Sequence, residues 1–147
     1  MSGKRVTIVE TAVKRYQKKH CVQLGPLSAT IEDVGVRPWS RRRAYKIEVS
    51  HGSATFTDSA ESEERLVKPV DFEQMAARTV HFMCEFLSAA KNDWEALVSS
   101  YLANISAPGE RDVVVRTLVG SRDAVRKHFR LSDLREAVAD ARSKGLL

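Results

Sequence analysis

Residues 44–57 read Ala44-Tyr-Lys-Ile-Glu-Val-Ser-His-Gly-Ser-Ala-Thr-Phe-Thr57, and this stretch decides the fold class. Apolar and polar residues alternate along both of its halves, and His51-Gly52 lies between them. An alternation with a period of two is typical of strands that bury one face. A glycine between two such runs favours a tight turn. The stretch therefore predicts a β-hairpin.

The same alternation occurs upstream, where Leu27, Ala29 and Ile31 are separated by polar residues. We therefore expect a three-stranded antiparallel meander over residues 27–57. The segment Gly35-Val-Arg-Pro-Trp-Ser-Arg-Arg-Arg43 connects the first two strands of this meander. Its arginines are expected at a loop and at the start of a strand rather than in the core.

The N-terminal segment predicts an amphipathic helix over residues 6–20. Val6, Val9, Val13 and Tyr16 recur at helical spacing, and Gly25-Pro26 follows as a breaker.

After the hairpin, residues 58–68 are polar, acidic and without periodicity, which predicts a mobile loop. A strong helical pattern then runs from Phe72 to Ala90, with Pro69 before it and Asp71 as its expected cap. A second helix is expected from about Asp93, and Ser-Ala-Pro-Gly at 106–109 breaks the chain.

The C-terminal part predicts three short helices. The first covers Arg111–Val119, the second and third are capped by Ser121 and Ser132, and Gly145 follows the last. The expected fold is α+β, with an N-terminal helix, a three-stranded antiparallel meander and a helical C-terminal half of about five helices. Residues 1–104 are expected to form the core domain and residues 105–147 a helical subdomain.

Charge is distributed unevenly along the 147 residues, whose formal net charge is +5. Residues 1–50 hold 11 Lys and Arg against 4 Asp and Glu, residues 51–110 hold 4 against 10, and residues 111–147 hold 9 against 5. Either these segments pair with one another, or the basic ones form a surface for a polyanion.

The sequence predicts a cytoplasmic protein. No apolar run approaches the roughly 18 residues of a membrane helix, and the N-terminus has no apolar signal region. Cys21 and Cys84 are expected in apolar surroundings as free thiols, which fits a reducing compartment.

No enzyme motif occurs in the sequence, and we predict neither catalysis nor a cofactor. The acids of 58–64 share one polar segment, so nothing there separates their pKa values for acid–base work. His20, Cys21, His81 and Cys84 are the residue types of a tetrahedral zinc site, but their spacing fits no zinc module and core packing explains them better. We predict no metal site.

The basic connection between the first two strands is the strongest functional signal. Arginine grips phosphate or carboxylate with a planar fork, and an exposed tryptophan can stack on a base. The predicted binding residues are Arg37, Trp39, Arg41, Arg42, Arg43 and Lys46, extended by Lys14 and Lys18 of the N-terminal helix. Two other interpretations stay open. Trp39 can cap the core while the arginines solvate the loop or pair with the acids of 58–64, or Arg and Trp can form a hot spot for a protein partner.

Two families share features with this chain. The order helix, three antiparallel strands, helix over residues 6–90 resembles double-stranded RNA-binding domains in topology. Those domains place lysines at the start of the second helix, where this chain reads Lys68-Pro-Val-Asp-Phe-Glu73 and is net acidic. We therefore do not infer their RNA contact.

The segment Ser121-Arg-Asp-Ala-Val-Arg-Lys-His-Phe-Arg-Leu-Ser132, with the following residues to Leu147, resembles a helix-turn-helix or winged-helix element. That resemblance implies DNA contact through Arg122, Arg126, Arg135 and Arg142. Plain packing of helices is the alternative.

The preferred function is non-enzymatic binding of nucleic acid, RNA above DNA, or of a nucleoprotein complex through the basic Arg/Trp surface. The first alternative is a small inhibitor or adaptor that acts by protein contact. Small proteins without motifs or cofactors are common on phages and plasmids, where they block nucleic-acid machinery such as CRISPR effectors. A DNA-binding regulator that uses the C-terminal helices is the second alternative.

Overall fold

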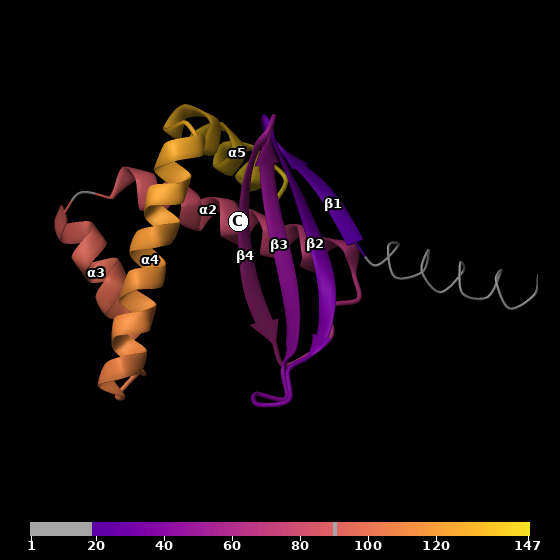
Figure 1. Cartoon of the computed structure of the whole chain (residues 1–147). Coiled ribbons are helices and arrows are strands. Elements are labelled where there is room, and N and C mark those ends of the chain that lie inside the picture. The colour runs from indigo at the N-terminus through magenta and orange to yellow at the C-terminus, as the bar shows by residue number, and fades with distance from the viewer. Residues whose placement is uncertain (1–18, 90) are drawn as a thin grey trace, which may run out of the picture.

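A computed structural model describes residues 19–89 and 91–147 of the chain. It contains a four-stranded antiparallel sheet with the strand order β1-β2-β3-β4, shown in Figure 1. The strands are β1 (Lys19–Leu24), β2 (Leu27–Val36), β3 (Arg43–His51) and β4 (Ala54–Ser62). The predicted hairpin is confirmed, because β3 pairs with β4 from Val49↔Phe56 to His51↔Ala54. The α+β class is confirmed too, but the sheet has four strands rather than three.

The additional strand is β1. The predicted N-terminal helix over residues 6–20 is therefore wrong at its C-terminal end. Lys19 and His20 belong to β1 and pair with Glu32 and Ile31 of β2. The rest of that predicted helix lies outside the described residues. A tight turn at Gly25, whose φ is +55°, brings β1 back against β2, so tertiary pairing outweighs the local helical pattern here.

The expected loop at 58–68 is wrong for its first half. Residues 58–62 continue β4, where Asp58 pairs with Ile47 and Glu61 with Ala44. Pairing with β3 satisfies the backbone groups of β4 that face β3, despite the polar side chains of β4. Only residues 63–68 connect the sheet to the first described helix.

The described helices are α2 (Pro69–Ser88), α3 (Lys91–Leu102), α4 (Pro108–His128) and α5 (Leu131–Ser143). The C-terminal part thus has two helices instead of three, because α4 runs unbroken through Gly120 and Ser121. The expected caps also differ, since Lys68 and Arg130 occupy the N-cap positions of α2 and α5. Gly145 does follow the last helix, with a φ of +74°.

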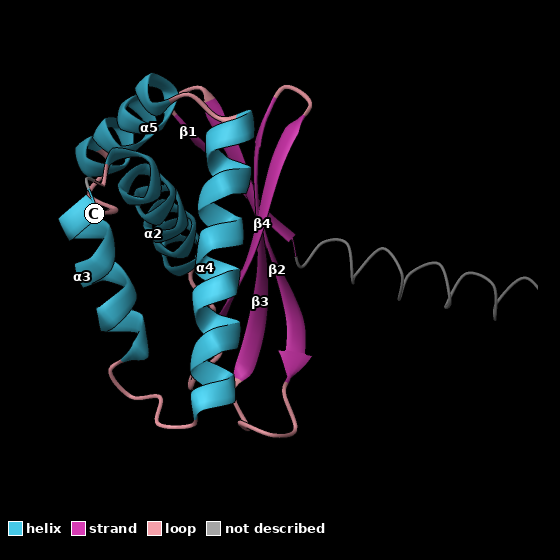
Figure 2. Ribbon diagram, turned by 60° about the vertical axis from the view of Figure 1, so that its left-hand side comes forward, coloured by secondary structure: helices cyan, strands magenta, loops and turns pink. Residues whose placement is uncertain are grey.

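The described helices all lie on one side of the sheet, as Figure 2 shows. Helix α2 contacts β1, β2 and β3, α5 packs on α2 and on β1, and α4 contacts β4. Tyr45, Ile47 and Val49 are fully buried between the layers. One core cluster extends from Leu24 of β1 to Leu146 beyond α5. No described helix is both long enough and apolar enough to cross a bilayer.

Candidate functional site

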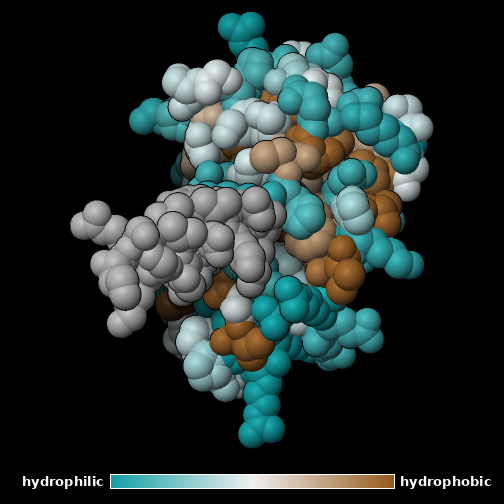
Figure 3. All heavy atoms as spheres, turned by 90° about the vertical axis from the view of Figure 1, so that its right-hand side faces the viewer, coloured by the Kyte–Doolittle hydropathy of each residue, from teal (hydrophilic) through white to brown (hydrophobic). Residues whose placement is uncertain are grey.

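The β2–β3 turn, residues 37–42, lies at one end of the sheet (Figure 1). Two backbone hydrogen bonds of 2.8 Å close it, one from the amide of Arg37 to the carbonyl of Arg42 and one from the amide of Arg41 to the carbonyl of Arg37. Trp39 lies at its tip and is 75% exposed. The end of the molecule that holds this turn carries hydrophilic side chains around small hydrophobic spots (Figure 3).

The exposed ring of Trp39 is held by its neighbour Arg37. The guanidinium carbon of Arg37 lies 5.3 Å from the centre of the Trp39 ring, which is a cation–π distance. The Nε of Arg37 also lies 3.2 Å from a carboxylate oxygen of Glu61 on β4. That contact is electrostatic, because the N–H of Nε does not point at the oxygen. Glu61 thereby positions Arg37, and Arg37 positions the indole.

Three further predicted cations are engaged in ion pairs. Arg43 donates two hydrogen bonds, of 2.9 and 3.1 Å, to the two carboxylate oxygens of Asp33. Arg42 contacts Glu63 at 3.0 Å, and Lys46 contacts Glu48 on the open face of the sheet at 2.9 Å. Lys46 does point away from the core, as its strand position predicts. These pairs offset much of the positive charge that the sequence places near the turn.

Arg41 differs from the other arginines of the turn. Within residues 19–89 and 91–147 it has no ion pair. Its φ is +56°, in the left-handed region that a side chain occupies only at a cost. Val34 and Val36 of β2 are 52% and 55% exposed beside the turn. The end of the sheet thus combines one aromatic ring, apolar side chains and, among the described residues, one arginine of the turn without an ion pair.

The structure spreads the other predicted site residues over the fold. Lys14 and Lys18 lie outside the described residues. Arg122 on α4 stacks over Trp94 of α3 at 4.6 Å, and Arg126 is exposed on the same helix. Arg135 and Arg142 are exposed on α5, whose opposite face is buried.

The candidate zinc ligands do not assemble. In the described part of the chain, no three His, Cys, Asp or Glu side chains are placed to hold a metal ion. His20 stacks on Phe72 at 3.7 Å. Cys21 is exposed, so the expectation of apolar surroundings was wrong for it. Burial raises the pKa of the Cys84 thiol, which is opposite to what a nucleophile requires.

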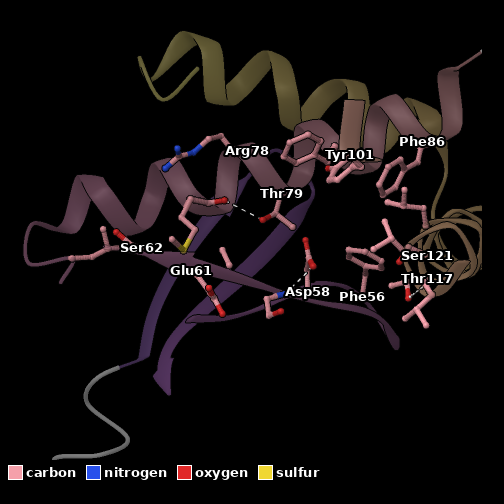
Figure 4. Close-up of a pocket in the computed structure, with 18 residues that line it drawn as sticks. Phe56, Asp58, Glu61, Ser62, Arg78, Thr79, Phe86, Tyr101, Thr117 and Ser121 are labelled. Carbon is pink, nitrogen blue, oxygen red and sulfur yellow. Dashed lines mark hydrogen bonds between the residues drawn. The ribbon is translucent and has the colours of Figure 1, made fainter. Parts of the chain in front are cut away.

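A second site was missed by sequence reasoning. A hollow of about 590 Å³ lies between β4, α2, α3 and α4, and Figure 4 shows its lining. Asp58 lines it because it follows Phe56 by two positions on β4 and so shares the inward side of the strand. Extending the alternation Ala54, Phe56 through Asp58 to Ala60 was the signal that could have found this site.

The surroundings of Asp58 disfavour its charge. Desolvation by the surrounding protein raises the pKa of its carboxyl, and the hydrogen bond from the amide of Ser59 lowers it by a smaller amount. Asp58 is nevertheless a solvent-exposed residue, so this desolvation is partial. Desolvation also raises the pKa of Tyr101, and the negative charge of Asp58 raises it further. The charge of Asp58 therefore acts on Tyr101 across the hollow.

Comparison with models of protein families, with curated proteins and with solved structures gave no match.

Proposed function

We propose that this chain is a non-enzymatic binding protein that engages a protein partner through its β2–β3 turn. The observation that carries the proposal is Trp39, which is 75% exposed and held at the tip of the turn under the guanidinium of Arg37. Tryptophan and arginine are the residues most enriched at energetic hot spots of protein interfaces. An inhibitor or adaptor of nucleic-acid machinery would use such a turn.

Electrostatics favour a protein partner over nucleic acid. The acidic partners Glu61, Glu63 and Asp33 face Arg37, Arg42 and Arg43. Phosphate binding depends on cations that are free to replace counterions. Arg41 is the turn's one cation without an ion pair among the described residues. We therefore place protein ahead of RNA, reversing the order that composition suggested.

The strain at Arg41 supports a role in binding. A side chain at a φ of +56° costs about 1 kcal/mol relative to glycine. Residues held in such conformations cluster at functional sites. The partner we propose offers an apolar pocket for Trp39 and a carboxylate for Arg41, with Val34 and Val36 at the rim of the interface.

The experiment is quantitative affinity capture from a bacterial lysate with the full-length chain, followed by measurement of Kd for the captured protein. Trp39→Ala should weaken binding at least about 30-fold, because a hot-spot truncation costs about 2 kcal/mol or more. Val119→Ala is the matched control, since Val119 is an exposed apolar residue on α4. It should bind as the unmodified chain does.

A parallel fluorescence anisotropy titration uses single-stranded RNA and DNA at about 50 and about 200 mM salt. Tight binding that collapses at the higher salt and is lost in Arg41→Ala would assign the turn to nucleic acid instead. A partner whose Kd is the same for Trp39→Ala and the unmodified chain would overturn the proposal.

A further inference from the structure

The hollow between β4 and the helices has the dimensions of a small-molecule site. Its volume of about 590 Å³ lies within the roughly 300–1,000 Å³ of ligand pockets in proteins. In Figure 4, the side chains of the sheet and of the helices converge on a common space. The site lies on β4 and the helices and does not include Trp39 or Arg41 of the turn.

The walls of this hollow are largely apolar. Its aromatic lining consists of Phe56, Phe82, Phe86 and Tyr101. The hydroxyls of Thr79 and Thr117 also line it, but each donates to the backbone carbonyl four residues earlier in its own helix. These two hydroxyl donors are already used within their helices, so they do not require a polar group on a ligand. The walls therefore favour a ligand with an apolar body.

Two carboxylates interrupt these walls. Glu61 lies 3.2 Å from Nε of Arg37, which leaves Asp58. One of its carboxylate oxygens, Oδ1, accepts a 2.8 Å hydrogen bond from the amide of Ser59. The other has no hydrogen bond or ion pair with any residue that the structure describes. Arg78 lines the same hollow, but its side chain points away from Asp58 in Figure 4, and its Nε donates to the carbonyl of Gln74.

A carboxylate among aromatic rings is complementary to an organic cation. A positive charge beside Asp58 would compensate a negative charge that the apolar surroundings disfavour. The faces of the rings attract the same cation through their quadrupoles. A carboxylate ligand would be repelled, and a neutral ligand would leave Asp58 uncompensated.

We propose that this hollow binds a small organic amine, with its ammonium group on the free oxygen of Asp58 and its apolar body against the aromatic walls. The proposal goes beyond the function of the β2–β3 turn and does not depend on it. Tyr101 lies across the hollow from Asp58 (Figure 4), and its hydroxyl has no hydrogen-bond partner within residues 19–89 and 91–147. It can therefore serve a polar substituent of the ligand.

The test compares three probes that share an indole body and differ in charge: tryptamine, tryptophol and indolepropionate. Each is titrated into the full-length protein while amide chemical shifts are followed by NMR. Tryptamine should bind at least about tenfold tighter than tryptophol, which is the effect of one charge-assisted hydrogen bond. Indolepropionate should bind weakest, and the shifts should map to β4, α2, α3 and α4.

Two variants that remove one negative charge each distinguish a contact with Asp58 from an effect of the overall charge of the protein. Asp58→Asn should reduce the affinity for tryptamine to that for tryptophol. Asp123→Asn removes an exposed carboxylate of α4 that does not line the hollow, and it should leave all three affinities unchanged. A third variant, Thr117→Phe, places a ring in the hollow from α4 and should weaken tryptamine and tryptophol alike.

Three results with the indole probes would overturn the proposal. They are no tryptamine binding at millimolar concentration, equal affinities for tryptamine and tryptophol, and unchanged tryptamine affinity in Asp58→Asn. A capped lysine amide is the last probe. Binding as tight as that of tryptamine would assign the hollow to a basic side chain of another protein rather than to a small amine.

Discussion

The backbone amide of Gly25 donates a 2.8 Å hydrogen bond to the carboxylate of Asp140, which lies 115 residues later in the chain. Lys144 reinforces this link, because its Nζ contacts Asp140 at 3.0 Å and the carbonyl of Gln23 at 2.7 Å. The C-terminal helix α5 is thereby joined to the turn between β1 and β2. The two ends of the described fold hold each other in place.

Replacing Gly25 should destabilise the protein more than replacing a comparable turn glycine. A Cβ at this position would lie 3.0 Å from the backbone nitrogen of Ala137, at a φ of +55°. We expect Gly25→Ala to cost about 2–3 kcal/mol, from backbone strain and the displacement of α5. Urea unfolding followed by circular dichroism measures the loss.

Gly52 supplies the matched control for that substitution. It has a similar φ of +62°, and a Cβ there would meet nothing within 4 Å. Gly52→Ala should therefore cost only the backbone strain, about 1 kcal/mol. An equal decrease in the free energy of unfolding for both variants would show that the close contact of Gly25 with α5 does not affect stability.

Asp140→Asn should lower the stability in a pH-dependent way. The Gly25 amide, and after it Lys144, hold the pKa of the Asp140 carboxyl below its ordinary value of 3.8. A lowered pKa contributes stability that is present above 3.8 and is lost as the pH falls through the folded-state pKa. The melting temperatures of Asp140→Asn and the unmodified chain should thus differ at neutral pH and converge on acidification. A gap that stays constant down to roughly pH 2 would contradict this linkage.

The strands could be predicted where apolar and polar residues alternate in the sequence. They could not be predicted where only pairing with a neighbouring strand decides the conformation. The β3–β4 hairpin follows from alternation around His51-Gly52. Strand β1 does not, because the preceding residues carry a helical pattern, and only pairing with β2 decides the conformation of Lys19 and His20. The long helix α4 was divided in error at Gly120 and Ser121, two residues that disfavour helix interiors locally but are accommodated in it.

Tyr45→Phe should cost about 1–3 kcal/mol, although only one hydroxyl is removed. Tyr45 is fully buried, and its hydroxyl oxygen accepts a 2.8 Å hydrogen bond from the backbone amide of Leu66. The variant leaves that amide without its partner. Tyr101→Phe is the control, because no described residue bonds to the Tyr101 hydroxyl, and it should change the stability little. Chemical denaturation compares the two, and similar losses would rule out the Leu66 bond as the cause.

Asp58→Asn should stabilise the protein at neutral pH. The pKa of Asp58 is raised above 3.8 chiefly by desolvation, so folding favours its protonated form. The associated stability is complete below 3.8 and is lost as the pH rises through the folded-state pKa. The variant should melt higher than the unmodified chain at about pH 7 and equally at about pH 3. The other ionisable side chains that line the hollow are Glu61, Arg78 and Tyr101. A lower melting temperature for the variant at neutral pH would contradict this reading of Asp58.

The two candidate sites were predictable to different extents. The outward position of Lys46 follows from the strand pattern, whereas the loop position of Trp39 left open whether its ring covers the core or faces solvent. Pairing of the arginines with the acids of 58–64 was one of the open interpretations, and the pairs of Arg37 with Glu61 and of Arg42 with Glu63 agree with it. The pair of Arg43 with Asp33, 10 positions away, was not predicted. The hollow is formed by four elements from different parts of the chain. How closely these elements pack cannot be predicted from the local sequence of any one of them.

Only Leu118 and Val125 are buried among the 21 residues of helix α4. Helices with so few buried contacts open in sub-global fluctuations, well before the chain unfolds as a whole. Amide protons of α4 should therefore exchange with solvent faster than those of β2 and β3. Because α4 forms one wall of the hollow, we expect local opening of this helix to limit the size of the molecule that can enter and the time that it stays bound.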